Sequence, residues 1–323
     1  MTHRTVVVLD HPFANLNPEQ RILAPIGADV VDAQAQSEED ALQVCRQADA
    51  VLVRRFPVTR RVIKAMERCV IICNYGAGYD NIDVPAARER GIEVANTSGY
   101  ADEEVADHTL ALLLALSRRL VPQVRDLAAT ATEGARVKWS HTPYVPVRRL
   151  RGQTLGIVGF GRIGQTVARK ALGIGLHVIA ADPAVPADAG DELGVALLPL
   201  PELLQRADFV SLHTPLLPQT HHLLGESELR LMKPTAYLLN CARGGIVDQG
   251  ALLSALQSGR LAGAGLDVLE EEPPSAETLQ TLLDLPNVVV TPHVAWYSKE
   301  AIADRQRMAA ETVRRALQGV PTQ

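Results

Sequence analysis

The chain alternates short apolar stretches with helical ones along most of its 323 residues, and this alternation limits the possible folds more than any other feature. The stretches "TVVVLD", "DAVLVRR" and "VIICNYGAG" have the length and composition of buried strands. Between them, "SEEDALQVCRQA" spaces its apolar residues as one face of a helix does. Strands that alternate with helices form parallel sheets joined by crossover helices. The sequence therefore predicts an α/β fold.

The alternation runs through two parts of the chain. Residues 121–150 are polar and irregular, contain Pro143 and Pro146, and are interpreted as a connector. Before them, residues 102–119 are predicted to form one long helix with acidic residues in its first turn. A second series of strands and helices starts at "QTLGIVGFGRIG". We therefore predict two doubly wound parallel-sheet (Rossmann-like) domains with a cleft between them.

Composition and charge argue against several classes of partner. The formal net charge is −5 and no dense run of lysine and arginine occurs, so neither nucleic acid nor an anionic membrane is expected as the main partner. The longest apolar run, within residues 105–117, is too short to span a bilayer. Four cysteines without a CxxC pair, and a first segment that resembles a strand rather than a signal peptide, favour a cytoplasmic protein. His213, His221 and His222 have no carboxylate or thiolate partners at metal-ligand spacing, so no metal site is predicted.

A glycine-rich segment, "GFGRIG" at residues 159–164, lies directly between a predicted strand and a predicted helix. In this context the first glycine makes a tight turn, the second lets the backbone approach a pyrophosphate, and the third lets the helix pack on the strand. Asp182 ends the next strand, where a carboxylate can accept the ribose hydroxyl protons, and Pro183 and Ala184 follow instead of the cations typical of an NADP enzyme. The predicted cofactor is NAD. The candidate contacts here are Gly159, Gly161, Arg162, Ile163, Gly164 and Asp182.

Arg243, Asp267 and His293 each follow an apolar run in the second part of the chain. The carboxyl ends of parallel strands line the crevice of a doubly wound sheet. A guanidinium there can hold a carboxylate through two parallel hydrogen bonds, and an imidazole can pass a proton to or from an oxygen. These groups suit hydride transfer at the carbon next to a carboxylate, so the predicted substrate is a 2-hydroxy or 2-oxo acid. The alternative for Arg243 is an ion pair with an acid such as Asp248.

Together these segments resemble the D-isomer-specific 2-hydroxyacid dehydrogenases, and the likeness covers nearly the whole chain in order. The resemblance implies that Arg243 binds the substrate, His293 transfers the proton and Glu272 tunes the histidine. It rests on "NYGAGYDNID", "EEVADHTLALLLALSRRL", "GFGRIG…AAD", "NCARGGIVD", "LDVLEEEPP" and "TPHVAWYS". The last of these motifs is most similar to the C-terminal binding protein branch, which groups with the phosphoglycerate dehydrogenase-like members.

The resemblance also implies further contacts and a topology. Asp267 resembles the residue that bonds the nicotinamide carboxamide, and Thr214 resembles one on the adenosine side. The implied topology inserts an NAD-binding domain, residues 103–294, into a substrate domain formed by residues 1–102 and 295–323. The long helix before the connector would join the domains and help to form a homodimer. The full set of implied further cofactor contacts is Thr214, Cys241, Ala242 and Asp267.

The substrate side is less strongly defined by the sequence. A strand end at Gly76–Gly78 could offer backbone amides to a carboxylate, and Trp296 could wall the pocket. Phosphoglycerate dehydrogenases and the corepressors carry an arginine at the position of Asn74, so its absence weakens a 3-phosphoglycerate assignment. Arg54 resembles another arginine that contacts a phosphate in the family, so a substrate with an anionic tail is still consistent with the sequence. The candidate substrate contacts are Asn74, Gly76, Ala77, Gly78, Arg243 and Trp296.

Two functions fit the sequence. The favoured one is an NAD-dependent D-2-hydroxyacid dehydrogenase that uses Arg243 and the Glu272–His293 pair. The alternative is an NAD(H)-sensing, corepressor-like dimeric scaffold with weak dehydrogenase activity, although such corepressors carry extensions beyond the folded core. A formate dehydrogenase-like reaction fits poorly because that chemistry does not use a proton-accepting Glu–His pair.

Overall fold

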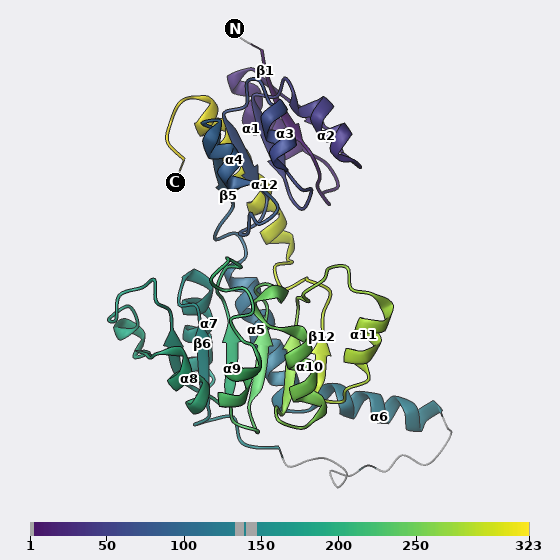
Figure 1. The fold of residues 1–323 in the computed structure, drawn as a ribbon, viewed down its shortest axis with the longest axis vertical. Coiled ribbons are helices and arrows are strands. Elements are labelled where there is room, and N and C mark those ends of the chain that lie inside the picture. The colour runs from purple at the N-terminus through teal and green to yellow at the C-terminus, as the bar shows by residue number, and fades with distance from the viewer. Residues whose placement is uncertain (1–2, 133–138, 140–146, 323) are drawn as a thin grey trace. The chain divides into compact units, whose positions relative to one another are not determined.

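The computed structural model describes residues 3–132, 139 and 147–322. The chain forms two compact units, shown in Figure 1. Unit 1 comprises Met1–Ala101 and Tyr297–Gln323, and unit 2 comprises Asp102–Trp296. Since unit 1 contains both ends of the chain, unit 2 is an insertion in its sequence.

Unit 1 contains a five-stranded parallel sheet in the order β2-β1-β3-β4-β5. Its strands are β1 (Arg4–Val8), β2 (Ala28–Asp32), β3 (Ala50–Val53), β4 (Ile71–Asn74) and β5 (Glu93–Asn96). Its helices are α1 (Asn17–Leu23), the 3₁₀ turn η1 (Ala24–Ile26), α2 (Glu38–Cys45), α3 (Arg60–Ala65), α4 (Val84–Glu89) and α12 (Lys299–Leu317).

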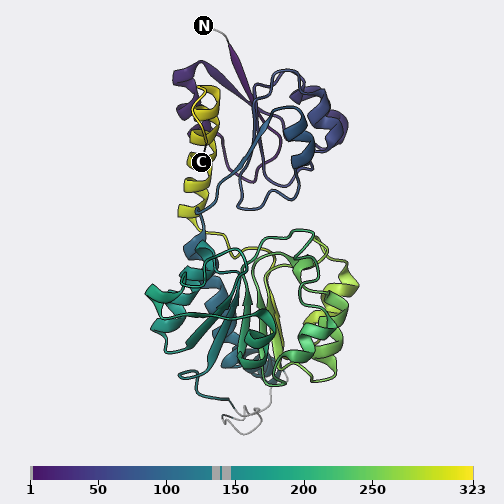
Figure 2. The same cartoon turned by 60° about the vertical axis from the view of Figure 1, so that its left-hand side comes forward.

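Side chains of β1 alternate between the two faces of this sheet and so enter two separate cores. Val6 and Val8 belong to one core together with Val313 of α12, the yellow helix that runs along the sheet in Figure 2. Val7 and Leu9 belong to the other core, which α2, α3 and α4 cover. Because both faces are buried in the middle of the sheet, β3 and β4 are nearly continuous apolar runs rather than alternating ones.

Unit 2 contains a seven-stranded parallel sheet in the order β12-β11-β10-β9-β6-β7-β8. Its strands are β6 (Thr154–Val158), β7 (His177–Ala181), β8 (Ala196–Leu197), β9 (Phe209–Leu212), β10 (Tyr237–Asn240), β11 (Gly263–Leu266) and β12 (Val288–Val290). Its helices are α5 (Asp102–Ser117), α6 (Leu120–Thr132), α7 (Arg162–Gly173), α8 (Leu200–Arg206), α9 (Glu226–Leu231), α10 (Gln249–Gln257) and α11 (Ala276–Leu283), with 3₁₀ turns η2 (Asp191–Leu193) and η3 (Gly244–Ile246).

The strand order of unit 2 reverses at β6, which pairs with β7 on one side and with β9 on the other. In a doubly wound sheet, such a switch point is where the loops after the strands diverge and leave room for a ligand. The predicted fold class, two α/β units on parallel sheets, is confirmed by this topology.

Helix α5 packs tightly on the sheet of unit 2. A side chain at Gly265 of β11 would meet Leu112 and Leu116 of α5, whose atoms lie 3.0 and 3.2 Å from the position of the missing Cβ. Lys170 of α7 forms ion pairs with Glu103 and Asp107 on the outer side of α5. The helix is therefore fixed on two sides, and it can place a side chain accurately at the end of the sheet.

The prediction of an irregular connector at residues 121–150 is wrong for its first part, because Leu120–Thr132 forms helix α6. Arg119, with a φ of 53°, separates α5 from α6, and Pro122 lies in the first turn, where a proline costs no hydrogen bond. Pro143 and Pro146 lie outside the described residues. Among the described helices, none combines the length and the hydrophobicity needed to cross a bilayer.

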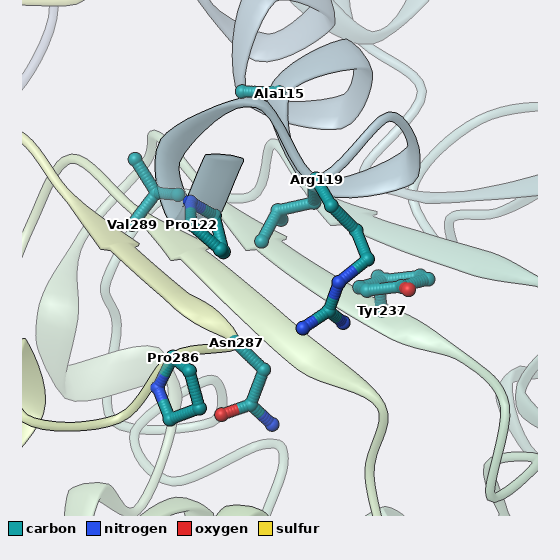
Figure 3. A pocket seen from close by; sticks show the side chains of 8 residues that line it. Ala115, Arg119, Pro122, Tyr237, Pro286, Asn287 and Val289 are labelled. Carbon is teal, nitrogen blue, oxygen red and sulfur yellow. The ribbon is translucent and has the colours of Figure 1, made fainter. Parts of the chain in front are cut away.

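Figure 3 shows a small pocket between the turn that joins α5 to α6 and the sheet. Arg119, Pro122 and Tyr237 are among its lining residues. Tyr237 is the first residue of β10, so this pocket lies at the amino ends of the strands. It is therefore remote from the carboxyl ends of the strands, where the candidate site residues lie.

Candidate active site

The three glycines of the loop after β6 have three different surroundings. At Gly159 (φ 95°), a Cβ would lie 2.6 Å from the carbonyl carbon of His213, so the loop crosses directly over the end of β9. At Gly164, a Cβ would lie 2.2 Å from the carbonyl oxygen of Gly159, so only glycine lets α7 approach the loop. At Gly161, no atom lies within 4 Å of the Cβ position. The protein itself requires the first and third glycines, whereas the second faces open space suited to a ligand.

Asp182 at the end of β7 holds this loop in place. Its Oδ2 accepts a hydrogen bond from the amide of Phe160 (2.8 Å), and its Oδ1 accepts one from the amide of Ala184 (2.8 Å). Helix α7 begins after Gly161, and no side chain of this N-cap residue accepts a hydrogen bond from the first amides of the helix. Free amides at a helix N-terminus favour a phosphate, and a carboxylate oxygen can accept more than one hydrogen bond. These residues fit the pyrophosphate and ribose of a dinucleotide.

The other predicted cofactor contacts lie around the same edge of the sheet. The Nε of Arg162 bonds to Oδ2 of Asp102 (2.8 Å), and the guanidinium remains largely exposed. The amide of Thr214 lies 2.7 Å from the Cβ position at Gly159. Cys241 follows β10, and burial raises the pKa of its thiol to about 12. Ile163 and Ala242 are half-buried beside the cores of unit 2.

Asn240, the last residue of β10, shapes the loop that carries Arg243. Its side chain accepts a hydrogen bond from the amide of Ala242 (3.0 Å) and donates one to the carbonyl of Arg243 (2.9 Å). The Arg243 Nη1 donates to the carbonyl of Ala242 (2.8 Å). A Cβ at Gly244 would lie 1.9 Å from the carbonyl oxygen of Leu269. This glycine therefore lets the loop after β10 contact the loop after β11.

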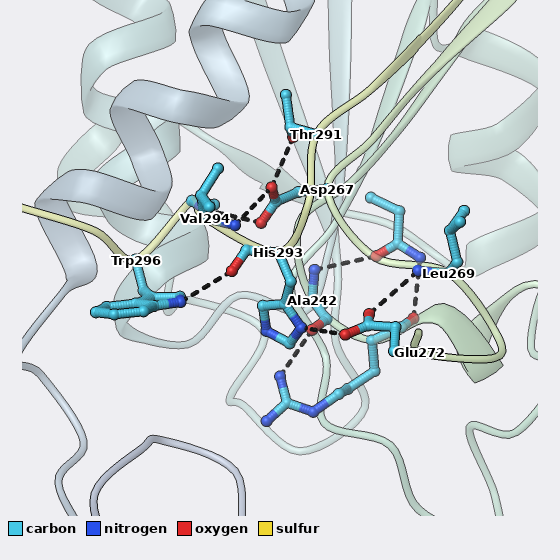
Figure 4. A network of polar contacts seen from close by, with 11 residues as sticks. Ala242, Asp267, Leu269, Glu272, Thr291, His293, Val294 and Trp296 are labelled. Carbon is cyan, nitrogen blue, oxygen red and sulfur yellow. Dashed lines mark hydrogen bonds and ion pairs between the residues drawn. The ribbon is translucent and has the colours of Figure 1, made fainter. Parts of the chain in front are cut away.

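Glu272 and His293 form a short ion pair, with Oε2 and Nδ1 2.6 Å apart (Figure 4). The other carboxylate oxygen of Glu272 accepts a hydrogen bond from the amide of Leu269 (3.2 Å). His293 has a φ of 55°, and its amide donates to the carbonyls of Asp267 (2.8 Å) and Thr291 (3.0 Å). About a quarter of each side chain, 26% for the histidine and 25% for the glutamate, remains exposed. The pair is thus held by the backbone and remains accessible from solvent.

Asp267 is almost completely buried, with 1% exposure, and it holds the segment around His293. Its Oδ1 accepts hydrogen bonds from Thr291 Oγ1 (2.6 Å) and the amide of Val294 (2.9 Å), and its Oδ2 accepts one from the amide of Ala295 (2.8 Å). His108 of α5 completes the network, with its Nε2 2.9 Å from Thr291 Oγ1. The sequence predicts Asp267 as a nicotinamide contact. The structure also gives it three hydrogen bonds that fix the turn after β12.

The structure brings Arg243, Glu272 and His293 to the carboxyl ends of β10, β11 and β12, which are neighbours in the sheet. This arrangement places a cation beside a hydrogen-bonded carboxylate–imidazole pair. The guanidinium can bind a carboxylate, and the imidazole can donate or accept a proton. Asp248, the alternative partner considered for Arg243, caps helix α10 by accepting a hydrogen bond from the amide of Ala251 (2.9 Å).

The predicted substrate contacts fall in both units. In unit 1, Asn74 is 2% exposed and supports a turn, because its Oδ1 accepts from the amide of Gly76 (2.7 Å) and its Nδ2 donates to Asn81 Oδ1 (2.8 Å). The amide of Gly76 is therefore engaged within the protein. Ala77 and Gly78 complete the turn. In unit 2, the Nε1 of Trp296 donates to the carbonyl of His293 (2.9 Å), as Figure 4 shows.

Sequence reasoning did not identify Asn240 and Thr291, which shape the site without carrying its chemistry. A signal was available for each residue, since Asn240 ends the strand before the arginine loop and Thr291 lies two residues before His293. Polar side chains at strand ends commonly bond to nearby backbone groups. Residue type and position alone, however, do not show which backbone group they reach.

The histidines considered for a metal site separate into two environments. His213 bonds to Ser211 Oγ (2.8 Å), and loss of solvation lowers the pKa of its imidazole to about 4, so its ring is neutral near pH 7. His221 and His222 stack with their ring centroids 4.0 Å apart. The structure adds a carboxylate that the sequence spacing does not reveal, since Glu270 lies 2.6 Å from His222.

Comparisons with known proteins agree with this geometry. Residues 110–295 match the model of the D-isomer-specific 2-hydroxyacid dehydrogenase NAD binding domain. The chain is 43% identical to a glyoxylate reductase of Korarchaeum cryptofilum over 284 residues, which cover 87% of this chain and 83% of the relative. It is 40% identical to a D-3-phosphoglycerate dehydrogenase of Methanocaldococcus jannaschii over 301 residues, which cover 93% of this chain but only 55% of that relative. The crystal structure of D-lactate dehydrogenase from Aquifex aeolicus with NAD and lactic acid matches with a TM-score of 0.84 and 29% identity, covering 98% of this chain and 96% of that one.

Proposed function

Because the chain belongs to the D-isomer-specific 2-hydroxyacid dehydrogenase family, we propose that it transfers a hydride between nicotinamide and C2 of a 2-hydroxy or 2-oxo acid. The observation that carries this proposal is the 2.6 Å contact between Glu272 and His293 at the strand ends that also carry Arg243. The relatives reported above are dehydrogenases and reductases, and they favour an enzyme over the corepressor-like scaffold.

NAD is the proposed cofactor, and when bound it supplies or accepts the hydride. The loop at Gly159–Gly164 and the N-terminus of α7 would hold its pyrophosphate. Asp182 would accept the ribose hydroxyl protons while its bonds to the loop remain in place. Neither Pro183 nor Ala184 offers the positive charge that a 2′-phosphate would need, so NAD is favoured over NADP.

In the reductive direction, His293 donates a proton to the oxygen at C2, and in the oxidative direction it accepts that proton. Glu272 orients the imidazole through Nδ1, which leaves Nε2 to face the substrate, and it stabilises the charged ring. Arg243 binds the substrate carboxylate next to C2 through parallel hydrogen bonds. The network around Asp267 keeps His293 in position while the proton moves.

The assignment of roles to the two units follows from these residues. We assign NAD binding to unit 2, and we assign a further part of substrate binding to unit 1 through the turn at Gly76–Gly78. Trp296 is assigned to the wall of the substrate pocket. The names of the relatives give glyoxylate, D-lactate and 3-phosphoglycerate as their substrates. This chain has Asn74 at the position where an arginine would be expected to bind a substrate phosphate. We therefore favour a short 2-oxo acid such as glyoxylate.

We also propose that the protein acts in the cytoplasm as a homodimer that uses the surface of α5 and α6. Helix α6 exposes Leu120 (50%), Val124 (64%) and Leu127 (38%). These positions are spaced i, i+4, i+7 and thus lie on one face of the helix. An apolar face of this kind on a helix that extends from unit 2 in Figure 1 is suited to a second copy of the chain.

The test is oxidation of NADH, followed by its absorbance, with glyoxylate, hydroxypyruvate, pyruvate, phenylpyruvate and longer or phosphorylated 2-oxo acids. We expect clear turnover with at least one short acid. The Arg243→Ala variant should lower kcat/KM by about 10²-fold or more, because it leaves the substrate carboxylate without its charged partner. Arg243→Lys should restore only part of the loss, since lysine keeps the charge but not the paired geometry.

Arg206→Ala is a matched control because it removes an exposed arginine that pairs with Glu202 within helix α8. It should leave kcat/KM unchanged. Equal activity of the wild type and Arg243→Ala would contradict the assigned role of the arginine. Tight NADH binding without turnover of any acid in the panel would contradict the dehydrogenase and favour the scaffold.

A further inference from the structure

His221, His222 and Glu270 converge at a point outside the proposed active site. Each residue offers one ligand atom, and these atoms all lie within 4.8 Å of one another. The two histidines precede helix α9, whereas Glu270 follows β11, so two loops 48 residues apart in sequence supply the donors. None of the three residues has a role in the proposed hydride or proton transfer.

The local backbone brings the two adjacent histidines to the same side. His222 has a φ of 51°, in the left-handed region that few residues other than glycine adopt. Its amide donates to the carbonyl of Gly245 (2.8 Å), which holds this conformation. Consecutive residues of an extended chain point in opposite directions, but here the two rings stack with an angle of 27° between their planes. The unusual residue therefore gives the loop two imidazoles directed to one place.

Glu270 is held toward the same place by a glutamine of another element. The Oε1 of Glu270 lies 2.6 Å from Nε2 of His222. Gln249 is the first residue of α10. Its backbone amide donates to Oε2 of Glu270 (3.3 Å), and its side-chain Oε1 accepts a hydrogen bond from the backbone amide of Glu270 (3.2 Å). About a third of each paired side chain is exposed, 35% for His222 and 36% for Glu270, so an ion can reach them from solvent.

We propose that His221, His222 and Glu270 bind a divalent transition-metal ion of the zinc class. Two imidazole nitrogens and one carboxylate oxygen form a donor set that zinc prefers, and water would complete a tetrahedral site. Hard ions such as Mg²⁺ and Ca²⁺ prefer oxygen ligands and would bind weakly. Because the loops that carry these residues already lie together, metal binding would require side-chain rotation that replaces the ring stack and the ion pair.

The proposed ion would connect the histidine loop to the loop that carries Glu272, beside the loop that carries Arg243. Glu270 precedes Glu272 by two residues on the same loop. His222 is hydrogen-bonded to Gly245, which follows Arg243 by two residues. An ion at this point would therefore hold the Glu272 loop to the histidine loop, whose backbone bonds to the Arg243 loop, without contacting substrate. Its role would be structural, and it does not depend on the proposed dehydrogenase reaction.

The test is isothermal titration of the full-length chain with Zn²⁺. We expect one equivalent to bind to the wild type, and we expect Glu270→Gln and His222→Asn each to weaken that binding at least about tenfold, as the loss of a metal-supporting group does. Asparagine is chosen at position 222 because it tolerates a positive φ. Glu271→Gln is the matched control, since it removes an exposed charge one residue away and should leave Zn²⁺ affinity unchanged.

A second control separates this cluster from the Glu272–His293 pair, which also offers ligand atoms. His293→Asn should retain the Zn²⁺ equivalent if the cluster binds the ion. Saturating Zn²⁺ should also raise the melting temperature of the wild type by about 5 °C and leave that of Glu270→Gln unchanged. Absence of a Zn²⁺ equivalent in the wild type, or the same affinity in Glu270→Gln, would overturn the proposal and leave a His222–Glu270 ion pair only.

Discussion

At the scale of single residues, His293 has a tightly constrained backbone in the proposed active site. Its φ of 55° is maintained by hydrogen bonds from its own amide to two carbonyls and by the bonds of Asp267 to the next two residues. A residue other than glycine adopts this conformation only when its surroundings enforce it, and such residues concentrate at functional sites. The backbone thus fixes the imidazole before any substrate binds.

We predict that His293→Asn lowers kcat by about 10²–10⁴-fold, which is the usual contribution of a general acid or base. Asparagine is preferred to alanine because it accepts the positive φ, so the fold and the affinity for NADH should persist. Steady-state kinetics gives kcat, and the fluorescence of bound NADH gives the affinity. Glu272→Gln, which keeps a hydrogen-bond acceptor but removes the charge, should give a smaller loss. An unchanged kcat in His293→Asn would show that another group transfers the proton.

Glu19 offers a prediction at the same scale for unit 1. It is fully buried in α1 and accepts a hydrogen bond from Tyr75 Oη (2.8 Å). The side-chain Nε2 of Gln306 in α12 donates to both of its carboxylate oxygens (3.0 and 3.2 Å). Burial raises the pKa of Glu19 above its ordinary value of 4.5, while hydrogen bonds from the backbone, Tyr75 and Gln306 act in the opposite direction. The carboxyl group therefore binds its proton more tightly in the folded protein than in the unfolded one.

A raised pKa in the folded state contributes stability that is complete below pH 4.5 and is lost as the pH rises through the raised value. Glu19→Gln lacks this contribution. The free energy of unfolding of the wild type minus that of Glu19→Gln should therefore fall as the pH rises from 4.5, as measured by urea unfolding at several pH values. Glu192→Gln, at an exposed position, should show no such trend. A difference that is constant with pH would contradict the argument.

At the scale of elements, the loop between β6 and α7 separates the needs of the fold from those of the ligand. Gly161→Ala should leave the free energy of unfolding within about 0.5 kcal/mol of the wild type, because no protein atom lies near its Cβ position and its φ is −76°. The same change should weaken NADH binding at least about tenfold, since the added methyl group would lie between the protein backbone and the pyrophosphate that it must approach. Urea unfolding and NADH titration measure the two effects.

Gly164→Ala provides the contrasting variant. Its Cβ would lie 2.2 Å from the carbonyl oxygen of Gly159, so α7 must move and the protein should lose about 1–3 kcal/mol of stability. If Gly161→Ala bound NADH as tightly as the wild type, the cofactor would have to lie elsewhere. If it were as destabilised as Gly164→Ala, the space beside Gly161 would belong to the fold and not to a ligand.

The sequence predicts elements better than it predicts the contacts between their loops. Strand runs, the glycine loop and the strand-end positions of Arg243 and His293 follow from local pattern, and the predicted family and fold are confirmed. The position of Glu270 beside His222 could not be predicted, because it depends on how two loops 48 residues apart approach each other. Helix α6 was missed because its proline and its mixed composition mask a helical spacing of apolar residues.

At the scale of the whole molecule, helix α6 has an apolar face that none of the described residues covers. Its base is anchored, since the Arg125 Nη1 donates to the carbonyl of Leu283 (3.2 Å), while Leu120, Val124 and Leu127 are exposed. Exposed apolar side chains that share one helix face favour association, because burial of each one removes apolar surface from water. A second copy of the chain is the partner that we propose for this face.

We predict that the wild type elutes with twice the monomer mass of 34.9 kDa and that Val124→Asp combined with Leu127→Asp shifts it to the monomer. Two carboxylates buried without partners oppose association strongly, so the dimer should weaken by far more than tenfold. Size-exclusion chromatography with light scattering at several concentrations measures the mass. Ala129→Asp is the control, because it adds one carboxylate on the opposite, exposed face of α6 and should leave the dimer intact. A wild type that is monomeric at micromolar concentration would show that this face has another use, whereas dissociation by Ala129→Asp alone would place the interface on the other side of the helix.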